Sequence, residues 1–195
     1  MQAVLRVESI IKNEESAMRK VAMIAGAVVL GVLFYTLSAK LAIYTPISPV
    51  PITGQTLVVF LLSALYGRRL SIATMGSYIG LGLMGAPIFT GASGLAIIST
   101  PNFGYLIGMG VAAIFMGEIG SRGTMKKRMS GCIMLTIATA VIYLCGMAWL
   151  GLFVGYGEKL FIIGVAPFIV GDIAKIFLAF ILVTPLKKVM YYQEK

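Results

Sequence analysis

The segment PFIVGDIAKIFLAFIL, residues Pro167–Leu182, is almost wholly apolar, yet it contains Asp172 and Lys175. Residues three apart lie on one face of an α-helix, so the sequence places this carboxylate beside this ammonium group. Ionisable residues within a membrane-spanning helix are rare and usually functional, because charge is costly in lipid. The alternative is a structural ion pair whose lysine extends toward the membrane surface. We favour the functional interpretation.

The composition of the whole chain agrees with this reading of one segment. Hydrophobic residues make up 59% of the 195 residues and charged residues only 12%, against about 25% charged residues in a soluble domain. The chain has no histidine, which excludes imidazole metal sites and Ser-His or Cys-His catalysis. It also has no G-x-x-x-x-G-K-[ST] loop, so we expect it to bind no nucleotide or other cofactor and to be no enzyme.

Six apolar stretches are long enough, or nearly long enough, to span a bilayer as helices. They are residues 21–39, 54–67, 70–84, 103–120, 131–151 and 164–184. The second and third are separated only by Gly67-Arg68-Arg69, and two arginines at mid-membrane would cost several kcal/mol each, so we divide them there. The prediction is an all-α membrane protein with six transmembrane helices. Residues 1–20 would be a polar lead-in, 21–186 the membrane domain and 187–195 a tail.

The basic residues give the chain an orientation. With the N-terminus inside, thirteen of the sixteen Lys and Arg residues fall in inside segments. They are Arg6, Lys12, Arg19, Lys20, Arg68, Arg69, Arg122, Lys126, Lys127, Arg128, Lys187, Lys188 and Lys195. By the positive-inside rule both termini are cytoplasmic, as expected for a multi-pass protein of the cytoplasmic membrane. The net charge of +9 is therefore a topology signal and does not indicate nucleic-acid binding.

Three of the expected helices start in a similar way, at the outer face in this topology. The openings are PVPITGQT with Gln55, TPNFGY with Asn102 and Tyr105, and APFIVGDIAK with Asp172 and Lys175. Proline is tolerated in a first helical turn. We therefore expect three helix N-termini and their polar side chains at one depth, where the free N–H groups favour an anion. The uncharged loop GAPIFTGASGLAIIST, residues 85–100, could fold over such a site.

These motifs, in this order, resemble those of the BioY family, the biotin-specific substrate-binding (S) components of energy-coupling-factor (ECF) transporters. The resemblance covers about residues 20–190. It implies a six-helix S-component fold that binds biotin from outside, with a transmembrane coupling subunit and two ATPase subunits that use ATP to drive release. The resemblance implies ligand-binding roles for five residues. They are Gln55, Ser93, Tyr105, Asp172 and Lys175.

The chain departs from the family pattern in three places. Phe103 stands where many members have glycine, which would add bulk near the pocket, and Leu95 stands where a second glycine is common. The resemblance also implies that the first helix carries an Ala-x-x-x-Ala motif, or one similar to it, which docks the coupling subunit. Here the candidates for docking are Ala22-x-x-x-Gly26 and Ala27-x-x-x-Gly31.

Biotin has a carboxylate tail and a ureido ring with two N–H donors and one carbonyl. The resemblance implies that Asp172 accepts from the ureido N–H groups. Lys175 would pair with the carboxylate, which is the assignment we favour from sequence, or donate to the ureido carbonyl. The rival functions are a self-sufficient biotin carrier, proton-coupled through Asp172, and a transporter of another small carboxylate vitamin. A purely structural membrane subunit would leave Asp172 and Lys175 without a purpose.

Overall fold

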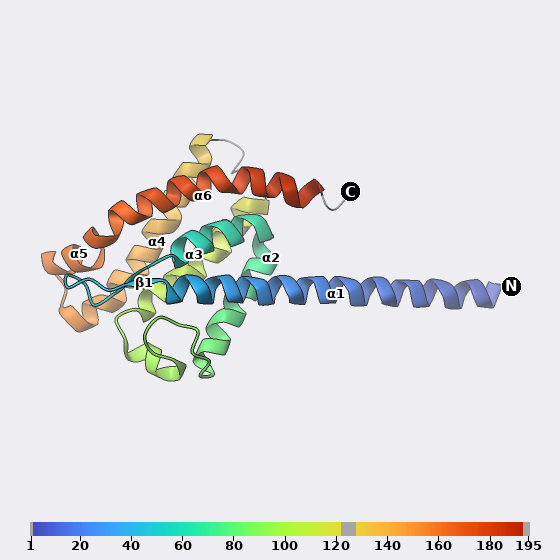
Figure 1. Cartoon of the computed structure of the whole chain (residues 1–195), viewed down its shortest axis with the longest axis horizontal. Helices are drawn as coiled ribbons and strands as arrows, with labels where there is room; N and C mark the ends of the chain where they lie inside the picture. The colour runs from blue at the N-terminus through green and yellow to red at the C-terminus, as the bar shows by residue number, and fades with distance from the viewer. Residues whose placement is uncertain (1, 122–127, 193–195) are drawn as a thin grey trace.

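The structure, a computed structural model, describes residues 2–121 and 128–192 and is a helical bundle with one short ribbon of strands (Figure 1). Its elements are α1 (Gln2–Lys40), β1 (Ala42–Ile43), β2 (Ile52–Thr53), α2 (Gln55–Leu83), a 3-10 helix η1 (Gly94–Ser99), α3 (Phe103–Ser121), α4 (Arg128–Val154), α5 (Glu158–Gly164) and α6 (Ala166–Tyr192). The basic residues predicted at 122, 126, 127 and 195 lie outside the described residues.

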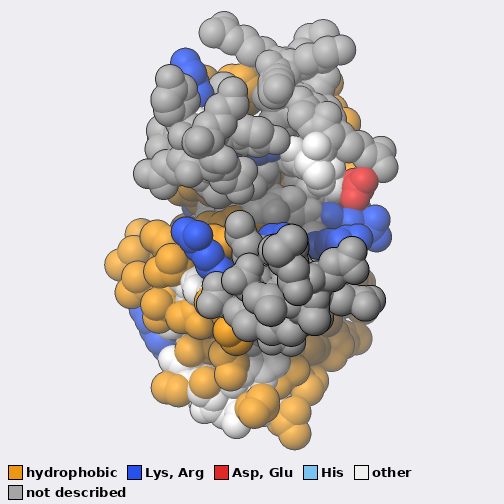
Figure 2. Space-filling view, turned by 90° about the vertical axis from the view of Figure 1, so that its right-hand side faces the viewer, with side chains coloured by type: hydrophobic (Ala, Val, Ile, Leu, Met, Phe, Trp, Pro, Cys, Tyr) orange, Lys and Arg blue, Asp and Glu red, His pale blue; other side chains and the backbone are white. Residues whose placement is uncertain are grey.

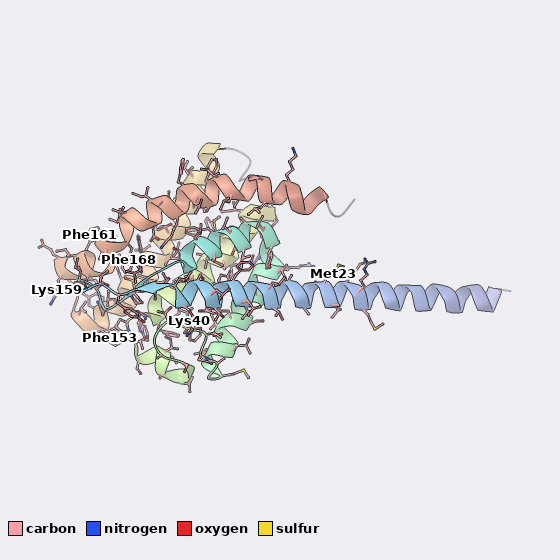
Figure 3. All side chains as sticks on the ribbon, in the orientation of Figure 1. Met23, Lys40, Phe153, Lys159, Phe161 and Phe168 are labelled. Carbon is pink, nitrogen blue, oxygen red and sulfur yellow. The ribbon has the colours of Figure 1, made fainter. Side chains whose placement is uncertain are left out.

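Helix α1 begins within the lead-in predicted from the sequence. It runs unbroken from Gln2 to Lys40, so residues 2–20 continue the first apolar helix toward the N-terminus. The N-terminal part of α1 projects beyond the bundle, and Met23 lies on it away from the other helices (Figure 3). The start of α1 and the end of α6 lie at the same end of the molecule (Figure 1).

Helix α2 reverses direction at Gly67, whose φ of 72° and ψ of 176° are non-helical. A positive φ of this kind is readily adopted by glycine alone. Before the reversal, the Tyr66 hydroxyl donates to the Ala27 carbonyl at 3.0 Å. After it, the Tyr78 ring lies 5.4 Å from the ring of Tyr35. The first half of α2 therefore descends along α1 and the second half returns, with the break at the glycine where the sequence predicts the boundary between two spans.

Glycines allow α3 to lie directly against its neighbours. A Cβ at Gly117 would collide with the backbone of Arg68, and one at Gly120 with the backbone of Ala64, both in α2. On another face of α3, a Cβ at Gly108 would meet the backbone of Ile142 in α4. Without a hydrophobic drive between helices in lipid, such close backbone approach supplies the packing. Helix α3 is accordingly the central helix of the bundle.

Within residues 2–121 and 128–192, five helices are long and apolar enough to cross a membrane, and they carry many exposed large apolar side chains. The candidate spans are Ala17–Lys40, Gln55–Leu83, Phe103–Ser121, Gly131–Val154 and Ala166–Lys188. The protein is a mostly helical, multi-pass membrane protein. Because Gln55–Leu83 counts as one span by length, the division into six spans stays a prediction.

The segments between the long helices contain elements that the sequence analysis missed. Strands β1 and β2 pair antiparallel, with Ala42 opposite Thr53, and α5 fills the connection before α6 (Figure 1). Two helix starts also differ from expectation. Pro51 and Pro101 precede α2 and α3, and only Pro167 lies in a first turn, that of α6. Pro51 and Pro101 therefore lie at the ends of the preceding loops and not in the first turns of the helices.

Candidate functional site

Two adjoining cavities lie at the end of the bundle where α1 ends, opposite the two chain termini; we call this the site end. The first, the Gln55 cavity, is lined by Val50, Pro51, Thr53, Gln55, Tyr78, Phe89, Thr90, Ile97, Asn102, Tyr105, Leu106 and Met109. The second, the Asp172 cavity, is lined by Val50, Pro51, Thr53, Thr56, Tyr105, Met109, Ile142, Tyr143, Phe168, Asp172 and Lys175. The shared walls make them two parts of one mostly apolar cleft.

The cleft is built by the starts of three helices, as the sequence predicts. Gln55 begins α2, Tyr105 lies in the first turn of α3, and Asp172 lies in the second turn of α6. In Figure 3 the labels of Phe168, near the start of α6, and Lys40, at the end of α1, mark this end of the bundle. A mostly apolar pocket with a few placed polar groups is the usual form of a small-molecule site.

Asp172 is the centre of the polar contacts in its cavity. Only 4% of the residue is exposed. Its Oδ1 accepts from Lys175 Nζ at 2.8 Å and from Thr56 Oγ1 at 3.2 Å, and its Oδ2 accepts from the Tyr143 hydroxyl at 2.6 Å. A buried charge is tolerated when it is paired and hydrogen-bonded. The carboxylate is thereby tied to α2 and α4 as well as to its own helix.

Gln55 belongs to a chain of hydrogen bonds in the other cavity. Its Nε2 donates to the Tyr78 hydroxyl at 2.9 Å, and that hydroxyl donates to the Ile88 carbonyl at 3.2 Å. Its Oε1 accepts from Thr53 Oγ1 at 3.4 Å, a long contact. Gln55 is itself buried. Its amide therefore keeps one N–H and most of its carbonyl capacity for a ligand.

Tyr105 separates the two cavities and contributes to both. Its hydroxyl donates to the Gly164 carbonyl at 2.7 Å, which ties α3 to α5. Its ring lies 6.1 Å from the ring of Phe168. Because the hydroxyl is already used, the ring is the part of Tyr105 that a ligand would contact. The residue is buried, as expected for a side chain in the wall of the cleft.

Asn102 carries an unpaired polar atom next to Gln55. Its Oδ1 is buried and has no hydrogen-bond partner among the residues that the structure describes, and the residue lines the Gln55 cavity. A buried polar group without a partner is costly. The Asn102 amide is therefore a further candidate for contact with a ligand.

Three residues that the sequence placed near the pocket lie elsewhere in this structure. Ser93 is exposed and lines neither cavity. Leu95 is 70% exposed. Phe103 packs its ring edge-on against Trp149, with the ring centroids 5.3 Å apart, so its bulk fills a contact between α3 and α4 and does not narrow the cleft. The structure thus gives no support to a tighter pocket at Phe103.

The small residues of α1 divide between two uses. Ala22 and Gly26 are exposed, and nothing lies within 4 Å of a Cβ added at Gly26. Gly31 is buried, and a Cβ there would collide with the Thr74 side chain of α2. The Ala27 carbonyl accepts from Tyr66. Ala27 and Gly31 therefore belong to the contact between α1 and α2, and only Ala22 and Gly26 remain free for a partner.

Sequence reasoning missed Thr56, Tyr143 and Tyr78. Thr56 directly follows Gln55 in the same motif, so its proximity could have been inferred. Tyr143 and Tyr78 each interrupt an apolar run with a hydroxyl, which is a weak signal, because tyrosines are frequent in membrane helices near the interfaces. Only the packing of α4 and α2 around the cleft shows their roles.

A family model described as the BioY family matches residues 12–192. The chain belongs to the BioY family. The match covers every element that contributes to the cleft.

Relatives within the BioY family are named as biotin transporters. A probable biotin transporter BioY of Pyrococcus horikoshii is 40% identical over 155 residues, covering 78% of this chain and 91% of the relative. The biotin transporter BioY of Thermotoga maritima is 30% identical over 145 residues, covering 73% and 84%. BioY2 of Lactococcus lactis, also named a biotin transporter, is 30% identical over 173 residues, covering 86% and 92%.

A solved structure has the same fold. The crystal structure of the S-component for biotin from an ECF-type ABC transporter superposes with a TM-score of 0.77 at 22% identity. It covers 87% of this chain and 93% of that one. The BioY fold seen here therefore matches that S-component over nearly its whole length.

The buried ion pair yields a prediction about stability. Lys175→Met keeps the side-chain length but leaves the Asp172 carboxylate without its cation. We expect it to lower the free energy of unfolding in detergent by about 1.5–3 kcal/mol, the range for a hydrogen bond to a charged group. Adding Asp172→Asn to Lys175→Met should recover part of this loss, because the uncompensated charge is then gone. Lys159→Met, at an exposed lysine, is the control. Equal losses in the single and double variants would contradict the prediction.

Proposed function

We propose that the chain binds biotin from outside the cell and serves as the substrate-binding S component of an ECF transporter. The observation that carries this proposal is the Asp172–Lys175 pair at one part of a mostly apolar cleft whose other part presents the Gln55 and Asn102 amides. Biotin has the matching chemistry, with a polar ring at one end, a carboxylate at the other and apolar atoms between them. Membership of the BioY family supports the same ligand.

The contact between Lys175 and Asp172 favours one of the two ligand orientations that the sequence left open. Their side chains are 2.8 Å apart, so both meet the same end of any ligand. The cation is already balanced by Asp172 and gains little from a further anion. We therefore assign Asp172 and Lys175 to the ureido ring, with the carboxylate accepting from its N–H groups and the ammonium donating to its carbonyl. The remaining N–H of the Gln55 amide then donates to the biotin carboxylate, in place of the Lys175 ammonium that the sequence analysis favours for that group.

The proposed topology has six spans, with the reversal of α2 at Gly67 dividing the second from the third. Both termini and the basic residues around Gly67 are cytoplasmic, and the site end faces outward. Figure 2, viewed from the end that holds the termini, has Lys and Arg side chains in several places on that surface. Arg68, next to Gly67, lies 3.4 Å from Glu118. This arrangement satisfies the positive-inside rule.

Energy for uptake would come from partners. We propose that the chain binds no cofactor and assembles with a transmembrane coupling subunit and two ATPase subunits, which hydrolyse ATP. The exposed Ala22 and Gly26 of α1 are the candidate contacts with the coupling subunit, since small residues allow helices to approach closely. The membrane would be the cytoplasmic membrane.

The ligand assignment can be tested by calorimetry with biotin, biotin methyl ester and lipoate, which shares the aliphatic carboxylate tail but lacks the ureido ring. We expect biotin to bind, the ester to bind more weakly and lipoate to bind poorly. Lys175→Ala and Asp172→Asn should weaken the binding of biotin and of its methyl ester alike, by about ten- to hundredfold, because each variant loses a charge-assisted contact with the ureido ring. Gln55→Ala should mainly reduce the difference in affinity between biotin and its methyl ester. If Lys175→Ala reduces that difference in affinity instead, Lys175 binds the biotin carboxylate and the proposed ligand orientation is wrong.

Energy coupling can be tested in a biotin-auxotrophic host that has neither its own biotin importer nor ECF subunits. Expressed alone, the chain should support no concentrative uptake, and co-expression with a coupling subunit and ATPases should restore it. Gly26→Leu should reduce the restored uptake without reducing biotin binding. Strong uptake by the chain alone, abolished by a protonophore, would favour the self-sufficient carrier.

Topology can be tested with single cysteines in a version that lacks Cys132 and Cys145. We expect Ser93→Cys to react with an impermeant thiol reagent on intact cells. Lys188→Cys should react only after the cells are opened. The positive-inside argument is the reason for this expectation. The reverse labelling pattern would contradict it and place the cleft on the cytoplasmic side.

A further inference from the structure

Tyr78 lies at the junction between the Gln55 cavity and the loop of residues 84–93. It is fully buried, and its ring meets the edge of the Phe89 ring, with centroids 5.3 Å apart at 81°. Phe89 is 3% exposed and fills the space over Gly82, where an added Cβ would overlap its ring. The loop is therefore anchored into the bundle by one aromatic side chain packed on Tyr78.

Two further bonds hold the same loop to the end of α1. Lys40 Nζ donates to the Phe89 carbonyl at 3.0 Å, and Thr90 Oγ1 donates to the Ala39 carbonyl at 2.8 Å. Phe89 and Thr90 also line the Gln55 cavity. The position of the loop thus determines part of the wall against which a ligand would lie.

The hydrogen-bond chain through Tyr78 fixes how Gln55 is oriented. The Ile88 carbonyl has no proton, so the Tyr78 hydroxyl must donate its own proton to it. The phenolic oxygen can then only accept, so the group facing it must be the amide NH₂ of Gln55. The Gln55 carbonyl must accordingly point to the other side, where Thr53 lies. A backbone carbonyl of the loop therefore sets which end of the Gln55 amide faces in each direction.

We propose that Tyr78 is a positioning residue that couples the packed state of the loop of residues 84–93 to ligand recognition by Gln55. With the loop in place, the Gln55 amide is held in one orientation and its second N–H is available to an anionic group. When the loop leaves, Tyr78 loses its acceptor, its hydroxyl becomes free to donate to Gln55, and the amide can turn. The proposal rests on the proposed function only in naming the anionic group as the biotin carboxylate.

The test uses the full chain in detergent with Tyr78→Phe, which removes one oxygen and keeps the ring between Tyr35 and Phe89. Tyr35→Phe is the matched control, a neighbouring buried tyrosine whose hydroxyl bonds to neither Gln55 nor the loop among the residues that the structure describes. We expect Tyr78→Phe to weaken biotin binding about three- to tenfold, the effect of one hydrogen bond. Its effect on biotin methyl ester should stay within about twofold, because the loss concerns recognition of the carboxylate.

Two further measurements separate positioning from packing. In a Gln55→Ala background, Tyr78→Phe should cause no further loss of biotin affinity, since the two residues act as one unit. In the ligand-free proteins, amide hydrogen exchange of peptides spanning residues 84–93 should be at least about threefold faster in Tyr78→Phe than in wild type and unchanged in Tyr35→Phe.

The outcomes that overturn the proposal are distinct. If Tyr78→Phe loses equal affinity for biotin and its methyl ester, or if its loss adds to that of Gln55→Ala, Tyr78 acts only in packing. Unchanged exchange in the loop would remove the coupling even if affinity fell. If wild-type protein binds no biotin, the proposed function fails. The exchange comparison still decides whether the Tyr78 hydroxyl holds the loop, and an unchanged rate would then overturn the coupling independently.

Discussion

The burial of the Asp172 carboxylate is the constraint on which the rest of the site depends. A charge within an apolar bundle needs compensation from several directions at once. Here Lys175 supplies the cation from the next turn of α6, Thr56 donates from α2 and Tyr143 donates from α4. These bonds fix the starts of α2 and α6 against the middle of α4. The Asp172 carboxylate is therefore held by long helices, and its contacts should change little when the segments between the helices move.

The close packing of α3 makes this convergence possible. Glycines in α3 bring its backbone against α2 on one side and α4 on the other, and the reversal at Gly67 brings both halves of α2 along α1. Side chains at the start of α2 and in its second half can then meet, as Gln55 and Tyr78 do. A straight α2 would place these residues some 34 Å apart along the axis, given the helical rise per residue.

The sequence predicted the helices, the break at Gly67 and the meeting of three polar helix starts, because apolar length, arginine cost and proline-polar motifs are local signals. It missed the β1–β2 ribbon and α5, which are short and depend on packing. It also could not tell that Gly31 is used inside the bundle while Gly26 is free, since both have the same spacing motif. Tyr143 was missed because its partner, Asp172, lies on another helix, and no local sequence pattern indicates such a contact.

The two cavities differ in what encloses them, and this difference bears on how a ligand could enter. The Asp172 cavity is lined mainly by residues of α3, α4 and α6, whereas Phe89, Thr90 and Ile97 of the segment between α2 and α3 close part of the Gln55 cavity. That segment is held by the buried Phe89 ring and by single hydrogen bonds from Lys40, Thr90 and Tyr78 to backbone carbonyls. Each bond from a neutral donor is worth about 1 kcal/mol, and the bond from the charged Lys40 is worth about 1.5–3 kcal/mol. Breaking them exposes the Gln55 cavity while leaving the ion pair intact. Opening the Gln55 side thus leaves the Asp172 carboxylate paired, whereas opening the Asp172 side would separate a buried charge from its three donors, which is the more costly change.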